Sequence, residues 1–434
     1  MGTPEQMDAL SIQRQTQDPI TVDGSICSAA QVKADCAEGT GSQIQLPEDI
    51  LYRIHALMPM RDAAQAACVS RAFLCSWRYY PNLILSVDSL GIKEYGSKYD
   101  EITRNFISRV DQIMQNHSGM GVKEFKLHKY PCSCSTIDPI IVDRWIQVAI
   151  TPGIKKFELS LFELGDIKYS FPCSFLSGVR GSSIRSLKLA GCSLRSMAKA
   201  GFMSSLTNLD FQSVDITGDE LFYFLSNSCA LEKISLWYCD NIICLKIPCQ
   251  LQKLNMLYEI INIPTAFGKF LQLKNLEIIF YAANFSQEFD FCSLISILDA
   301  SPTLETFIFR IGVPTIRHDS IIEDPLGNSS HPRRLSDCFH DNLKNVMITG
   351  FCSAKSMIEL TIHIMQKTKS LECLTLDTTR GHDRRFASID RCLRLNEEAL
   401  VEAGKAHTAI QRYIEGRVPA AVNLKVIEPC SKCL

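Results

Sequence analysis

One spaced apolar pattern recurs along most of this chain and limits what it can fold into. The pattern is apolar-x-x-apolar-x-apolar, as in IRSLKL, LTNLDF and LECLTL. Side chains alternate along a strand, so the fourth and sixth residues point to one face, and stacked copies join these faces into a core. The spacing therefore predicts a solenoid of parallel strands. We find ten copies, opening at Val122, Ile154, Ile184, Leu206, Leu231, Leu251, Leu273, Leu304, Leu343 and Leu371.

Helices are expected between these strands, at Pro139 to Ile150 with Asp138 as cap, at Asp219 to Asn227, and at Ser353 to Lys369. Alternating strands and helices predict an α/β fold, and the strand pattern is that of a leucine-rich repeat. The openings lie 20 to 39 residues apart, so the predicted horseshoe is irregular. The longest gap includes the 313–338 region and the polar segment RHDSIIEDPLGNSSHPRRLSDCF, which we expect to be a surface excursion with its role left open.

A second apolar stretch, residues 46–81, precedes the repeats. Pro47 is expected at the first position of a helix that Pro59 stops, and Ser70 is expected to cap a third helix carrying Trp77. Three helices this short fall below the roughly 40 residues that usually sustain a core alone, so part of their surface should dock on the remaining chain or on a partner. The apolar stripe of the first helix is Ile50, Leu51, Ile54, Leu57 and Met58.

The segment LPEDILYRIHALMP, followed by CVSRAF and Trp77, resembles the F-box of plant F-box proteins with leucine-rich repeats. VDRWIQVAITPGIKKFEL resembles the entry to the repeats of that family, and NLKNVMITGFCSAKSMIELTIHIMQKTKSLECLTL resembles its late region, called FBD in related members. The resemblance implies that the F-box binds the Skp-type linker subunit of a cullin-based ubiquitin ligase. The implied binding residues are Leu46, Pro47, Ile50, Leu51, Ile54, Leu57, Val69 and Ser70. A three-helix cap on a solenoid, with no partner, is the alternative.

Composition limits the kinds of partner and cellular compartment that we expect for this protein. The chain has 434 residues, 46% of them hydrophobic, a net charge of -2 and a pI near 6.5, which argues against nucleic acid and favours protein partners. Nineteen scattered cysteines indicate a reducing compartment. No run of about 18 apolar residues could span a bilayer, and the first residues lack the features of a signal peptide. We therefore expect a cytoplasmic or nuclear protein without membrane contact.

Four regions are predicted from these patterns. Residues 1–45 lack Phe, Tyr and Trp and are expected to be a mobile tail. Residues 46–81 are the F-box, and residues 82–395 are the solenoid, which begins with a strand at Leu83 to Val87 and a helix at Glu101 to His117. Residues 396–434 carry a helix at Asn396 to Gly416 and the strand VNLKVIE, which should close the end of the solenoid.

Catalytic and metal-binding motifs are not apparent in the sequence. There is no phosphate loop, zinc helix or nucleophile elbow. The tight thiol clusters are Cys132 and Cys134 near His128, and Cys430 with Cys433; we interpret them as buried or incidental thiols. No catalytic residue, metal or cofactor is expected.

The predicted function is a non-catalytic adaptor that presents a target protein to a ubiquitin ligase. A leucine-rich scaffold or small-ligand sensor is the runner-up, and a hydrolase with a hidden site is a third alternative. The sequence does not identify the target protein.

Target recognition is expected on the strand face, at the third, fifth and seventh position of each copy. Trp237 and Arg310 are the predicted anchors, because these residue types dominate binding interfaces. Packing of Trp237 beneath a neighbouring loop is the equal alternative. The full predicted set is Lys156, Glu158, Lys188, Asp210, Gln212, Lys233, Ser235, Trp237, Asn255, Glu277 and Arg310.

Overall fold

The computed structural model forms two compact units, Met1–Trp77 and Arg78–Leu434. It describes residues 46–92, 99–129, 137–161, 168–195, 203–226, 228–247, 250–258, 266–280, 289–312, 316–323, 335–379 and 394–431. The tail predicted for residues 1–45 lies outside these ranges.

The described part of the first unit is helical. It contains α1 (Glu48–Leu57), α2 (Met60–Val69) and α3 (Arg71–Trp77). Pro47 is not the first helical residue, as we expected, but the N-cap of α1, because its ψ of 144° is extended. Its carbonyl oxygen accepts hydrogen bonds from the amides of Ile50 and Leu51 at 3.0 Å. Ser70 Oγ accepts from the Phe73 amide at 3.5 Å, at the start of α3.

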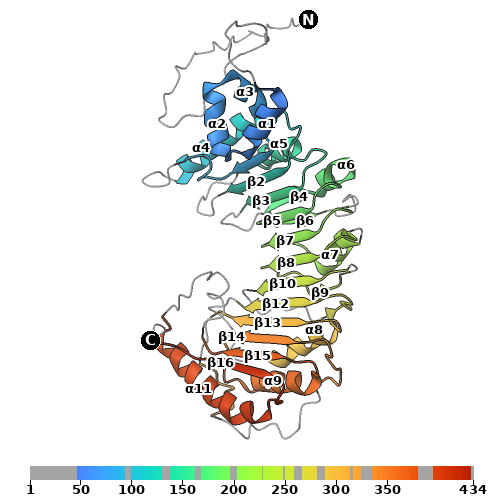
Figure 1. Cartoon of the computed structure of the whole chain (residues 1–434), viewed down its shortest axis with the longest axis vertical. Coiled ribbons are helices and arrows are strands. Elements are labelled where there is room, and N and C mark those ends of the chain that lie inside the picture. Colours follow the sequence, from blue (N-terminus) through green and yellow to red (C-terminus); the bar gives the residue numbers. More distant parts are fainter. Residues whose placement is uncertain are drawn as a thin grey trace, which may run out of the picture. The chain divides into compact units, whose positions relative to one another are not determined.

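A twelve-stranded parallel sheet organises the second unit (Figure 1). Its strands lie in chain order, so each one pairs only with its nearest sheet neighbours along the sequence. Ten of them begin two residues after the ten predicted openings, which confirms the predicted strand pattern. Strands were also expected at Leu83 to Val87 and in VNLKVIE, and these form the two edges. The strands are β1 (Asn82–Leu85), β2 (Glu124–Lys129), β3 (Lys156–Leu161), β5 (Ser186–Ala190), β7 (Asn208–Gln212), β8 (Lys233–Trp237), β10 (Lys253–Tyr258), β12 (Asn275–Phe280), β13 (Thr306–Ile311), β14 (Asn345–Thr349), β15 (Cys373–Asp377) and β16 (Asn423–Ile427).

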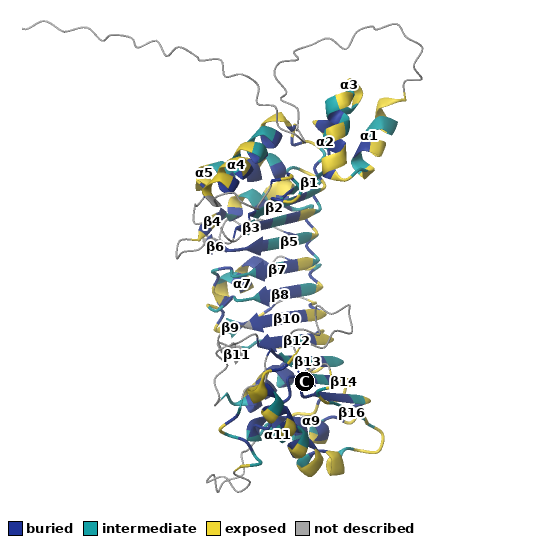
Figure 2. Ribbon diagram, turned by 90° about the vertical axis from the view of Figure 1, so that its left-hand side faces the viewer, coloured by how far each residue is buried: buried dark blue, intermediate teal, exposed yellow. Residues whose placement is uncertain are grey.

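The core of this unit is built from the fourth and sixth residues of the copies. In β3 these are Phe157 and Leu159, both fully buried. The ring of Phe157 stacks on that of Phe125 from β2, with 5.5 Å between centroids. Figure 2 shows the buried residues running along the strands from one repeat to the next. Burying such rings in register joins each repeat to the next one.

Helices connect the strands where the sequence predicted them. Asp138 caps α5 by accepting from the Ile140 amide at 2.9 Å, and Asn396 caps α11 by accepting from the Ala399 amide at 3.0 Å. Thr217 and Glu220 form a capping box on α7 that we had not predicted. The helices are α4 (Tyr99–Asn116), α5 (Pro139–Ala149), α6 (Gly178–Gly181), α7 (Gly218–Leu225), α8 (Ile295–Asp299), α9 (Lys355–Lys367) and α11 (Glu397–Tyr413), with 3-10 turns η1 (Cys173–Leu176), η3 (Phe291–Leu294) and η4 (Glu415–Arg417).

Short parallel pairs complete the described secondary structure. They are β4 (Tyr169–Pro172) with β6 (Cys192–Arg195), and β9 (Cys244–Leu245) with β11 (Ala266–Phe267). Within the described ranges, the second unit is thus a mixed α/β structure around a parallel sheet. The horseshoe form and the four predicted regions stay predictions.

Candidate binding faces

The first unit hides a histidine that the sequence did not single out. His55 is buried, and its Nε2 lies 2.8 Å from the carbonyl oxygen of Ala63 in α2. Its ring contacts Phe73 and Trp77 of α3, with centroids 5.0 and 6.1 Å away. One polar side chain therefore ties the three helices together, from a position on α1 adjacent to the apolar stripe.

Five of the eight residues predicted to bind the linker are exposed and do not pack into this small core. Leu57 is 86% exposed and Val69 is 88% exposed, which are high values for apolar side chains. Leu46, Pro47 and Ile54 are exposed, while the other three, Ile50, Leu51 and Ser70, are partly buried. The eight predicted residues thus remain accessible to different degrees.

The second candidate face is the polar face of the large sheet. Strand register places Lys126, Glu158, Lys188 and Asp210 side by side on β2, β3, β5 and β7. Lys156 is exposed at the start of β3, and Lys233 is partly exposed at the start of β8. The structure therefore brings the predicted target-binding residues of the first repeats into one row.

Glu158 of this row has a carboxyl group with a shifted pKa. Its Oε1 lies 3.1 Å from His128 Nε2 and 2.8 Å from Lys188 Nζ. Burial alone raises the pKa of Glu158, but the hydrogen bonds from His128 and Lys188 and the positive charge of Lys188 lower it to about 2. Glu158 is therefore a fixed negative charge between two donors.

The predicted anchors have different surroundings. Arg310 donates from Nε to Glu277 Oε1 at 2.9 Å, and both side chains are largely buried, so this guanidinium is already engaged. Trp237 is partly exposed at the end of β8, and Gln212 lies beside it in register on β7.

Two residues of the predicted set are not exposed as we expected. Ser235 and Asn255 are buried to 4% exposure, although they occupy the fifth position of their repeats. Both side chains are short, and the longer Trp237 and Lys233 flank Ser235 on the same strand face. The prediction that these two side chains lie on the surface was therefore wrong, because both lie in the interior.

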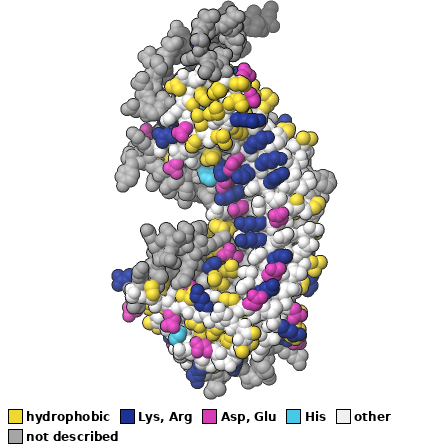
Figure 3. Space-filling model, viewed as in Figure 1, with side chains coloured by type: hydrophobic (Ala, Val, Ile, Leu, Met, Phe, Trp, Pro, Cys, Tyr) yellow, Lys and Arg dark blue, Asp and Glu magenta, His cyan; other side chains and the backbone are white. Residues whose placement is uncertain are grey.

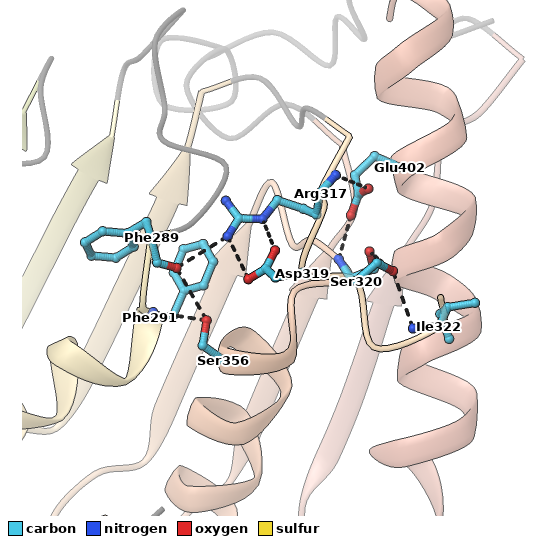
Figure 4. A network of polar contacts seen from close by, with 9 residues as sticks. Phe289, Phe291, Arg317, Asp319, Ser320, Ile322, Ser356 and Glu402 are labelled. Carbon is cyan, nitrogen blue, oxygen red and sulfur yellow. Dashed lines mark hydrogen bonds and ion pairs between the residues drawn. The ribbon is translucent and has the colours of Figure 1, made fainter. Parts of the chain in front are cut away.

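The expected surface excursion is also partly wrong. Residues 316–323 are described, and within them Arg317 and Ser320 are buried to 1% exposure. Arg317 donates from its Nε and one terminal nitrogen to the two carboxylate oxygens of Asp319, at 2.8 and 3.0 Å. The same terminal nitrogen lies 3.4 Å from the Phe289 carbonyl oxygen (Figure 4). Within residues 316–323, the polar groups of Arg317 are therefore satisfied by internal partners.

Helix α11 completes this network. Glu402 is fully buried and accepts the Arg317 amide at 3.2 Å and the Ser353 amide at 2.7 Å. Ser353 Oγ in turn donates to Ser320 Oγ at 2.7 Å. Burial raises the pKa of Glu402, while the backbone hydrogen bonds act in the opposite direction. Three segments distant in sequence are held by this one carboxyl group.

The described residues hold no group of three or more His, Cys, Asp or Glu side chains that could bind a metal ion. Cys132, Cys134 and Cys433 lie outside the described ranges, while Cys430 is exposed. Within the part of the chain that was described, no helix has the length and apolar character needed to cross a membrane.

Comparison with known proteins agrees with this architecture. Residues 113–258 and 256–431 match the family model described as At1g61320/AtMIF1, LRR domain. F-box/LRR-repeat protein 13 of Arabidopsis thaliana is 26% identical over 213 residues, which are 48% of this chain and 43% of that protein. Probable FBD-associated F-box protein At1g32375 of the same plant is 28% identical over 203 residues, covering 46% and 45%.

A third Arabidopsis thaliana relative, F-box/LRR-repeat protein At5g02910, is 24% identical over 217 residues, covering 50% of this chain and 43% of that protein. The chain thus spans less than half the length of these curated relatives. The family model, however, covers more than half of the chain and most of the strands described above. The chain therefore belongs to the plant family of F-box proteins with leucine-rich repeats.

Proposed function

We propose that this protein is the substrate-recognition adaptor of a Skp-cullin-F-box ubiquitin ligase. In this proposal the first unit binds a Skp-type linker, which connects it to a cullin, and the polar sheet face binds the target protein. The observation that carries the proposal is the exposure of Leu57 and Val69, together with that of Leu46 and Ile54 from the same predicted linker site. Covering a side chain of this size contributes about 1.5 to 3 kcal/mol, so a partner is favoured.

Such an adaptor acts by holding two proteins together. Tethering makes transfer of ubiquitin to a target lysine effectively intramolecular, so the adaptor needs two binding faces and no catalytic residue of its own. The names of the relatives, which are F-box proteins, support this proposal.

The test replaces Leu57 and Val69 by Asp in the full-length chain, co-expressed with a plant Skp-type linker. A charge placed in a buried apolar interface costs several kcal/mol, so co-purification should fall by about a hundredfold or more. Both side chains are exposed, so the variant should fold, which circular dichroism and the thermal midpoint of unfolding would check.

Leu271→Asp provides the matched control, because Leu271 is also an exposed leucine, at 66% exposure, but belongs to the second unit. It should leave linker binding unchanged. Undiminished binding by the Leu57→Asp, Val69→Asp variant would contradict the proposed site. If the unmodified chain does not bind the linker, the adaptor function is rejected, and a leucine-rich scaffold or small-ligand sensor becomes the better interpretation.

A further inference from the structure

A row of like charges crosses the first strands of the large sheet. Lys123, Lys155 and Arg185 each stand directly before a strand, at the second position of consecutive repeats. The Lys155 amide donates to the Lys123 carbonyl oxygen, and the Arg185 amide donates to the Lys155 carbonyl oxygen, both at 2.8 Å. Adjacent strands lie about 4.8 Å apart, so three cationic residues follow one another at that spacing.

A second pair of like charges lies farther along the same end of the strands, at the third position of repeats whose second positions are Glu232 and Gln252. Lys233 of β8 is directly opposite Lys253 of β10 in the sheet register. We call Lys123, Lys155, Arg185, Lys233 and Lys253 the basic edge. Among the described residues, no Asp or Glu side chain forms an ion pair with any of these five.

The later repeats of the same sheet provide an internal comparison. Their second positions are Lys274, Glu305, Lys344 and Glu372, so the sign alternates from strand to strand. Lys274 Nζ and Glu305 Oε1 form an ion pair at 3.2 Å. Opposite charges on adjacent strands stabilise a sheet and like charges destabilise it. The first repeats therefore keep an unfavourable arrangement that the later repeats of this chain avoid.

The excess of positive charge is local. From the second to the seventh position of the repeats of β2 to β10, eight Lys and Arg residues stand against four Asp and Glu residues. The whole chain, in contrast, carries a net charge of -2. Figure 3 shows this run of Lys and Arg side chains on the strand face. A bound anion would relieve the repulsion within the run.

We propose that the basic edge binds an acidic polypeptide segment, rich in Asp and Glu. Identifying this segment as part of the ubiquitination target rests on the proposed function, while the binding itself does not. The ligand crosses the starts of the strands, contacts the row formed by Lys123, Lys155 and Arg185, and extends toward Lys233 and Lys253.

The four carboxylates in the same region favour a polypeptide over a polyphosphate. Glu124 lies within 2.7 Å of Lys126 and 3.7 Å of Lys156, and Glu158 pairs with Lys188, so negative charge interrupts the face. A nucleic-acid backbone carries a charge at every residue and would be repelled there. A polypeptide can place neutral or basic side chains opposite these carboxylates.

The experiment measures fluorescence anisotropy of a labelled peptide of alternating Asp-Ser and Glu-Gly dipeptides, titrated with the full-length chain. An Asn-Ser and Gln-Gly peptide is the uncharged control, and a single-stranded oligonucleotide of equal formal charge is the competing class. The acidic peptide should bind more tightly than both, and its affinity should fall as salt is raised. The variant Lys123→Gln, Lys155→Gln, Arg185→Gln should bind it about tenfold more weakly.

A matched variant removes three positive charges elsewhere on the sheet, Lys274→Gln, Lys344→Gln, Lys425→Gln, and should retain the affinity. The basic-edge variant should also unfold at an equal or higher temperature, because repulsion is removed. Equal weakening by both variants, no binding by the unmodified chain, or tighter binding of the oligonucleotide would overturn the proposal. Linker binding is measured separately, so either proposal can fail alone.

Discussion

At the scale of single residues, Glu158 is the clearest case of a side chain fixed by its neighbours. Replacing it by Gln removes a charge that accepts hydrogen bonds from His128 and Lys188. We expect the free energy of unfolding at pH 7 to fall by about 1 to 3 kcal/mol. The folded pKa of about 2 lies below the ordinary 4.5, so this stabilisation is complete above pH 4.5 and is lost as the pH falls toward 2.

Denaturant unfolding of Glu158→Gln and the unmodified chain, at pH 7 and at pH 3, would measure this difference. Glu232→Gln is the control, since Glu232 is exposed and is not in an ion pair with any residue in the described part of the chain. A difference that does not shrink between the two pH values would contradict the linkage.

Single residues are also where prediction from sequence was least successful. His55 was missed because a histidine adjacent to an apolar stripe carries no signal of its burial. Ser235 and Asn255 were placed on the surface by register alone, which says nothing of the longer side chains around them. Burial of a short side chain depends on its neighbours across strands, and one sequence does not give their lengths in space.

At the scale of elements, the attachment of α11 through Glu402 can be tested. In Glu402→Gln only one acceptor oxygen remains, so one of the two amides loses its partner, at a cost of about 1 to 3 kcal/mol. Hydrogen exchange should therefore quicken in peptides that cover residues 316–323 and 351–358. Lys405→Gln, on the same helix, removes a surface ion pair with Glu323 and a positive charge near Glu402 but leaves both acceptor oxygens in place, so it should change exchange there less.

The elements themselves were largely predictable, because their signals are local. Each strand follows a short apolar pattern, and caps such as Asp138 and Asn396 stand beside the helices they begin. The environment of Arg317 was not predictable, because its partner Glu402 lies 85 residues farther along the chain. A polar segment with local partners and one with distant partners look alike in sequence.

At the scale of the whole second unit, three buried histidines predict how its stability depends on pH. Burial lowers the pKa of His117, His340 and His363. A hydrogen bond to the Tyr80 backbone acts in the opposite direction on the pKa of His117, and the negative charge of Asp299 does so for the other two. Because the unfolded chain binds these protons more readily, stability should fall as the pH drops below about 6.5.

Calorimetry between pH 8 and pH 5.5 would measure this fall as a lower midpoint of unfolding. The rings of His340 and His363 are 6.3 Å apart, and the charges near them are Asp299, Asp337, Asp341 and Lys367. His340→Asn with His363→Asn should flatten the dependence, whatever its effect at pH 8. An unchanged slope would show that other groups control it.

The chain-order arrangement of the sheet also bears on how the protein is made. As the ribosome releases the chain, each new strand finds its partner already in place, from β1 onward, so the sheet can grow by addition of one strand at a time. Glu402 emerges after fifteen of the sixteen described strands, β1 to β15, and only β16 follows it. The amides of Arg317 and Ser353 must therefore wait for their acceptor, and maturation of that region ends only when α11 has been synthesised.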